Sequence, residues 1–152
     1  MGARALTETV ASEIDIASSP QNVLDVLHDF ENYPLWARSM KHARIVERDD
    51  EGRAAKVEFH VAPGLLPEMR YVLHYTYADD GLSWDYVEGD LKDIRGSYTV
   101  AGADGSTHVT YNLAIDPGKI PLPGFVKARA AREITRIALK ELKRRVESSS
   151  AS

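Results

Sequence analysis

The chain has 152 residues, of which 43% are hydrophobic and 28% are charged, a balance that suits one globular domain with a buried core. It contains no cysteine, which excludes a disulfide framework and a thiolate metal site. No apolar run of signal-peptide length follows the first residues, and no stretch reaches the length of a membrane span, so we expect a soluble, cytoplasmic protein.

The N-terminal part predicts a strand followed by a short helical region. Apolar and polar residues alternate with a period of two over Thr9–Ile16, which is typical of a half-buried strand. Ser19 then precedes Pro20, which is a capping residue ahead of a proline at the first helical position. The apolar residues that follow at helical spacing are Val23, Val26, Leu27 and Phe30. We expect this helix to end near residues 32–34 and Pro34 to open another short turn that bears Trp36.

Residues 43–116 are expected to form a meander of antiparallel strands. Turn signals recur at 49–52, 62–64, 79–81 and 102–105, and the runs between them alternate in hydrophobicity. The positions expected to face inward include Val57, Phe59, Val61, Tyr71, Leu73, Tyr75, Tyr77, Leu82, Trp84, Tyr86, Ile94, Gly96, Tyr98, Val100, Val109, Tyr111, Leu113 and Ile115. The alternate positions, Val72 among them, are expected to face solvent.

The last long segment, Phe125–Glu147, predicts a helix of several turns. Its apolar arc consists of Val126, Ala130, Ala131, Ile134, Ile137, Ala138, Leu142 and Val146. A basic stripe beside this arc consists of Arg129, Arg132, Arg136, Lys140 and Lys143. Because the apolar arc needs a cover, we expect the antiparallel sheet to wrap around this helix in an α+β domain.

The charge is unevenly distributed along the chain. The net charge is −4, and Phe125–Glu147 carries eight Lys/Arg against three Glu, so this segment contributes +5 and the rest carries −9. One interpretation is a solvated helix face on an otherwise acidic surface. The other is docking of the basic stripe on an anionic partner, such as a membrane surface. The stripe lacks interleaved aromatic residues, which makes nucleic acid an unlikely partner.

Most of the aromatic residues fall on the inward face of the predicted sheet, and most of these are tyrosines. A buried tyrosine needs a partner for its hydroxyl, so a solid core would normally favour aliphatic side chains. Several tyrosines around one space indicate a cavity with apolar walls and a few polar points, as in pockets for small molecules. The alternative is an ordinary core in which the hydroxyls reach the rim of the sheet.

Two predicted loops have apolar tips bounded by proline and glycine. The first spans 62–67 and carries Leu65 and Leu66, and the second spans 118–124 and carries Ile120 and Leu122. Such tips are unusual on a surface that faces solvent. They are expected either to border the mouth of a cavity or to pack locally under the long helix.

The order of these features resembles the START-like helix-grip superfamily, in particular its polyketide cyclase/dehydrase and coenzyme Q-binding-like members. The residues that carry the resemblance are Ser19-Pro20, Tyr33-Pro34 with Trp36, the run from Leu82 to Asp90, Gly96-Ser97-Tyr98, and Leu122-Pro123-Gly124-Phe125. The resemblance implies a helix-grip fold, with short helices between the first two strands, and a deep pocket between the sheet and the C-terminal helix. We therefore expect residues 1–147 to form one START-like ligand-binding domain and residues 148–152 to form a disordered Ser-rich tail.

Catalytic and metal-binding signals are weak. The five histidines have no metal-ligand spacing, no phosphate-binding loop or nucleophile motif is present, and no cofactor is expected. A cyclase needs an acid/base pair and a donor for a developing enolate, whereas the inward set supplies tyrosine hydroxyls without a carboxylate, Lys or Arg. Binding is therefore favoured over catalysis, with a polyketide aromatase/cyclase or dehydratase that uses pocket tyrosines as the alternative.

The sequence thus predicts a protein that carries or sequesters a small hydrophobic or aromatic ligand, such as a lipid, quinone or polyketide. The residues expected to bind the ligand are Trp36, Phe59, Tyr71, Tyr75, Trp84, Tyr86, Tyr98 and Tyr111. The residues expected at the pocket mouth are Leu65, Leu66, Ile120 and Leu122.

Overall fold

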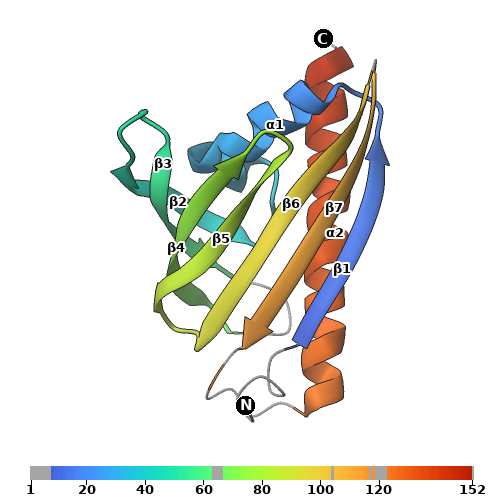
Figure 1. Ribbon diagram of the computed structural model, residues 1–152. Helices are drawn as coiled ribbons and strands as arrows, with labels where there is room; N and C mark the ends of the chain where they lie inside the picture. The colour runs from blue at the N-terminus through green and yellow to red at the C-terminus, as the bar shows by residue number, and fades with distance from the viewer. Residues whose placement is uncertain (1–7, 63–66, 104, 117, 119–122, 152) are drawn as a thin grey trace.

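The computed structural model describes residues 8–62, 67–103, 105–116, 118 and 123–151. Seven strands, two α-helices and one 3-10 helix follow one another along these residues (Figure 1). In chain order they are β1 (Glu8–Ile16), α1 (Pro20–His28), η2 (Phe30–Leu35), β2 (Met40–Arg48), β3 (Ala54–Val61), β4 (Met69–Ala78), β5 (Gly81–Gly89), β6 (Asp93–Ala103), β7 (Ser106–Asp116) and α2 (Gly124–Ala151).

The seven strands form one antiparallel sheet in the order β1-β7-β6-β5-β4-β3-β2. Helix α2 runs lengthwise along one face of this sheet, beside β1 and β7, and α1 crosses one end of the sheet and meets α2 (Figure 1). This arrangement confirms the predicted α+β helix-grip fold. Within the described ranges, no helix is long and apolar enough to cross a membrane.

The local signals around α1 are confirmed, but the helix is shorter than predicted. The Ser19 hydroxyl accepts a hydrogen bond from the backbone N–H of Asn22 at 3.2 Å, which caps the helix as expected. Helix α1 stops at His28, because Asp29 leaves the helical conformation with ψ 67°. The chain then tightens into η2, and Pro34 lies inside this 3-10 helix instead of opening a new turn.

Helix α2 buries a stripe that overlaps the predicted apolar arc at Ala131, Leu142 and Val146. Its buried residues are Ala131, Thr135, Leu139, Leu142 and Val146. Ile137, which was placed on the buried arc, is 48% exposed, so that placement is wrong. Thr135 can be buried because its hydroxyl lies 2.6 Å from the hydroxyl of Ser12 on β1, which satisfies both groups. The helix also continues to Ala151, so residues 148–151 are helical in the structure and do not form the predicted tail.

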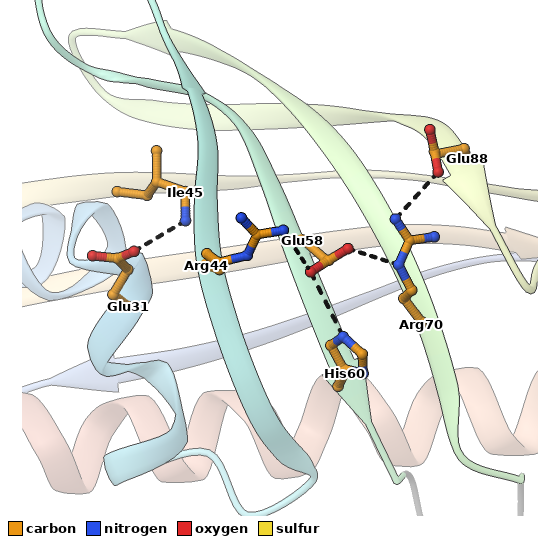
Figure 2. Close-up of polar contacts among 7 residues, drawn as sticks. All are labelled: Glu31, Arg44, Ile45, Glu58, His60, Arg70 and Glu88. Atoms are coloured by element: carbon orange, nitrogen blue, oxygen red, sulfur yellow. Dashed lines mark hydrogen bonds and ion pairs between the residues drawn. The ribbon is translucent and has the colours of Figure 1, made fainter.

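The outer face of β2, β3 and β4 faces solvent, as the alternation of apolar and polar residues predicts. It carries a network of ion pairs (Figure 2). The Glu58 carboxylate contacts Arg70 at 2.7 Å and Arg44 at 3.2 Å, and Arg70 also contacts Glu88 at 3.2 Å. The hydrogen bond from Arg70 is the main cause of the lowered pKa of Glu58. Val72, predicted to face solvent, is 5% exposed, because its cross-strand neighbours are Glu58 and Glu88 and the linked side chains surround it.

Candidate functional site

A cavity lies between the sheet, the region of η2 and helix α2, with a volume of about 110 Å³. Most of its wall is apolar or aromatic. The residues that line it are Tyr33, Trp36, Ala37, Ser39, Met40, Val61, Met69, Tyr71, Leu91, Ile94, Tyr98, Tyr111, Leu113, Ile115, Ile134, Ala138 and Glu141.

The size of this cavity limits what it holds without adjustment. An apolar cavity of about 150 Å³ can take up one benzene molecule, and pockets for larger ligands span roughly 300–1,000 Å³. The volume of about 110 Å³ is therefore smaller than one aromatic ring needs, and a ring enters only if the cavity wall moves outward. Met40 and Met69 lie in the wall, and their flexible side chains allow the cavity to enlarge at low cost.

The structure divides the predicted ligand-binding residues into two groups. Trp36, Tyr71, Tyr98 and Tyr111 line the cavity. The others lie outside its wall: Phe59, Tyr75 and Trp84 are buried, and Tyr86 is partly exposed. The four residues predicted at the pocket mouth, Leu65, Leu66, Ile120 and Leu122, lie outside the described residues.

The buried aromatic residues form a continuous cluster behind the cavity. The ring of Trp84 lies 5.5 Å from that of Tyr98 and 5.9 Å from that of Tyr75, and Tyr75 lies 4.4 Å from Phe30. Trp84 pairs across strands with Gly96, where any Cβ would lie 2.5 Å from the indole ring. The inward face of the sheet is therefore packed core in one part and cavity wall in another. The two interpretations of the sequence, an ordinary core and a cavity, each apply to part of this face.

Three tyrosine hydroxyls on the cavity wall lack protein partners. Tyr71, Tyr98 and Tyr111 are each 8% exposed and form no hydrogen bond with any described residue. In contrast, the hydroxyl of Tyr33 donates to the carbonyl oxygen of Leu27 at 2.5 Å. No fully enclosed side-chain polar atom within the described ranges is unpartnered, so the three free hydroxyls border open space.

Burial sets the protonation state of these tyrosines. Removal from water raises the pKa of Tyr71, and it raises the pKa of Tyr98 and Tyr111 well above the ordinary value of 10.0. For Tyr98, the neighbouring Tyr33 and Glu141 add to the effect of burial. The hydroxyls therefore stay protonated at neutral pH and can donate a hydrogen bond to a ligand.

A carboxylate on the cavity wall was missed by the sequence analysis. Glu141 is the charged residue among the described lining residues, and its Oε2 accepts a hydrogen bond from the backbone N–H of Arg38 at 3.0 Å. Spacing on the helix gives a signal that could have found it, because Glu141 follows Ala138 by three residues and Ile134 by seven and so shares their stripe. The prediction that the inward set lacks a carboxylate is therefore incomplete.

His108 and Arg95, which lie outside the cavity wall, form ion pairs on the surface. His108 on β7 lies between the carboxylates of Glu13 and Asp15, at 2.6 and 2.7 Å. Arg95 pairs with Asp93 at 3.0 Å. Across the described residues, no group of three or more His, Cys, Asp or Glu side chains is arranged to hold a metal ion.

The basic stripe of α2 is partly neutralised by its neighbours. Arg136 contacts Glu133 at 2.6 Å, and Lys143 contacts Glu147 at 2.7 Å and donates to the carbonyl oxygen of Asp15 at 2.8 Å. Arg129, Arg132 and Lys140 are exposed. The charged surface of α2 is therefore smaller than the sequence indicates.

Comparison with protein families shows which family the chain belongs to. The family model described as polyketide cyclase / dehydrase and lipid transport matches residues 7–147, which is nearly the whole chain. The chain belongs to this family. No curated protein matches this chain.

Several solved structures share the fold of this chain at low sequence identity. A START superfamily protein from Mycobacterium smegmatis is 23% identical, with a TM-score of 0.86 over 92% of this chain and 97% of that chain. The Zhui aromatase/cyclase from a Streptomyces species is 13% identical, with a TM-score of 0.76 over 93% and 94%. A STAR-related lipid transfer protein from Xanthomonas axonopodis is 16% identical, with a TM-score of 0.70 over 91% and 85%. These TM-scores establish a shared fold.

Proposed function

We propose that the protein binds a small hydrophobic or aromatic ligand non-covalently in the cavity under α2, and carries or sequesters it. The observation that supports this most is the pairing of apolar walls with three protonated, unpartnered tyrosine hydroxyls, those of Tyr71, Tyr98 and Tyr111. Apolar walls supply affinity, and a few polar groups orient the ligand. Trp36 contributes a further aromatic surface to the wall.

The energetics of the hydroxyls favour a ligand over a purely structural role. A hydroxyl on an apolar cavity wall gains little from its surroundings unless a ligand or water bonds to it, whereas phenylalanine at the same position would need no partner. Tyr33 and Tyr77 show how this fold satisfies a structural tyrosine, because their hydroxyls donate to the carbonyl oxygens of Leu27 and Ala54. Tyr98 and Tyr111 have no such acceptor among the described residues, and a bound ligand or water would supply one.

Catalysis is a second candidate, and one observation favours it. Glu141 and Tyr98 line the same cavity, so a carboxylate and a hydroxyl donor face one space, as acid/base chemistry would need. For an aromatase/cyclase or dehydratase, Tyr98→Phe abolishes turnover of a polyketide-like chain and leaves its affinity nearly unchanged. For a carrier, the same substitution weakens binding, and no turnover is measured in either protein.

A cavity-filling variant tests the proposed function. Ala138 lies on α2 at the cavity wall, and Ala138→Leu places a larger side chain in the space that a ligand would occupy. Lys140→Leu adds a leucine at an exposed position of the same helix and is the matched control. Native mass spectrometry of protein purified from its source organism is expected to detect an apolar adduct on the wild type and on Lys140→Leu but not on Ala138→Leu. An adduct that survives Ala138→Leu would place the ligand elsewhere and contradict the proposal.

A further inference from the structure

The polar groups of the cavity are unequally distributed between its two walls. Tyr98 lies on β6, and Glu141 faces the same space from α2. Only Oε2 of Glu141 is engaged, by the backbone N–H of Arg38, which leaves Oε1 without a hydrogen bond to any described residue. The cavity thus offers unpartnered hydroxyl donors, that of Tyr98 among them, and one carboxylate acceptor that the fold itself does not use.

Both groups face one cavity of only about 110 Å³, so a ligand bound there lies against both of them. The charge of Glu141 also contributes to the raised pKa of Tyr98, after burial and Tyr33. A protonated tyrosine offers its hydrogen, whereas a carboxylate only accepts. A ligand oxygen placed between them must therefore accept from one side and donate to the other. A hydroxyl group does both, while a ketone or an ether oxygen only accepts.

We propose that the cavity selects ligands that carry a hydroxyl on an apolar ring, with this hydroxyl accepting from Tyr98 and donating to Glu141. This inference rests on the proposed function and adds the chemical class of the ligand. A hydrogen bond to a charged group contributes more than one between neutral groups, so Glu141 is the stronger determinant of the two. The small volume, about 110 Å³, restricts the recognised part to one ring.

Phenol and toluene form a matched pair of probes, because they differ by a hydroxyl in place of a methyl group of similar size. An apolar cavity without hydrogen-bonding groups binds toluene more tightly, since phenol loses hydration on entry. The inference predicts the reverse order, with phenol bound about tenfold or more tightly than toluene. The two dissociation constants are measured at pH 7 by NMR titration of the wild-type chain.

Two variants test whether Glu141 and Tyr98 cause the preference for phenol over toluene. Glu141→Gln keeps an oxygen that accepts from Arg38, so the local structure is retained while the charged acceptor is lost. Tyr98→Phe removes the donor and keeps the ring. Each is expected to lower the phenol-to-toluene affinity ratio at least about fivefold with little change for toluene. Tyr77→Phe removes a hydroxyl that donates to Ala54 outside the cavity wall, and it should leave the ratio unchanged.

The outcomes separate this inference from the proposed function. Tighter binding of toluene than phenol by the wild type, or a ratio that Glu141→Gln leaves unchanged, would overturn the hydroxyl selectivity while the apolar binding site stands. If neither probe binds, the site and its selectivity fail together. A ratio that falls in both cavity variants and not in Tyr77→Phe supports the assignment.

Discussion

Leu142 and Ile137 lie five residues apart on α2 and on opposite faces of the helix: Leu142 is fully buried, and Ile137 is 48% exposed. Leu142→Ala should therefore lower the free energy of unfolding by about 2–5 kcal/mol, because it leaves a cavity against the sheet. Ile137→Ala should change it by no more than about 0.5 kcal/mol. Denaturant unfolding of both variants checks this, and equal losses would contradict the orientation of α2.

Gly96 provides the space for Trp84 on the neighbouring strand. A Cβ at residue 96 would lie 2.5 Å from the indole ring and 2.6 Å from the carbonyl oxygen of Asn112, and the carbonyl cannot move without disturbing the sheet. Gly96→Ala is expected to destabilise the fold by about 1–3 kcal/mol and to shift the tryptophan emission.

Gly124→Ala is the control for this substitution, because a Cβ at residue 124 meets nothing within 4 Å. Thermal unfolding and fluorescence of the two variants give the comparison. Native stability and unchanged emission in Gly96→Ala would show that the packing of Trp84 is not as described.

His108 makes the stability depend on pH. Hydrogen bonds to Glu13 and then to Asp15 raise the pKa of His108 above the ordinary 6.5. A group whose folded pKa is raised contributes stability that is fully present below its unfolded pKa, near 6.5, and is lost as the pH rises through the folded pKa. The free energy of unfolding should therefore fall as the pH rises above about 6.5, through this group. His108→Gln should flatten that part of the profile, and an unchanged slope would exclude His108 as its source.

Much of the fold could be predicted because its signals are local. The turn residues between strands and the Ser19-Pro20 cap are short-range features, and the structure follows them closely. Strand alternation also decides which face a residue occupies, so Tyr71, Tyr98 and Tyr111 were correctly expected to face inward.

The finer placement depends on contacts between distant segments. Alternation does not say which part of the inner face α2 covers, so it could not separate Trp84, which is buried in the aromatic cluster, from Tyr98, which lines the cavity. The rotation of α2 was ambiguous because apolar residues such as Phe125 and Ile137 also occupy its exposed side, at 76% and 48% exposure. The burial of Thr135 depends on Ser12, which lies 123 residues away in the chain.

Binding of an anionic partner to α2 remains a prediction, and it now involves fewer basic residues of the helix. Arg129, Arg132 and Lys140 are exposed, and Phe125 beside them is 76% exposed. Each cation near an anionic lipid surface contributes about 1 kcal/mol, so Arg129→Gln with Arg132→Gln should weaken binding to phosphatidylserine vesicles by more than about tenfold. Binding should also fall with salt.

Arg95→Gln is the control for the vesicle experiment, because Arg95 lies on β6 and is paired with Asp93. It should leave vesicle sedimentation unchanged. Vesicle binding that is insensitive both to salt and to the two α2 substitutions would remove the docking interpretation.

The cavity under α2 is tested most directly by methyl NMR during a toluene titration. Saturable shifts are expected at Leu113, Ile115 and Ile134, which line the cavity, with little change at Ile16 and Val57, which are buried elsewhere in the core. In Ala138→Leu the shifts at the cavity methyl groups should be lost. Shifts of equal size throughout the core, or none at the three cavity residues, would contradict a ligand site in this cavity.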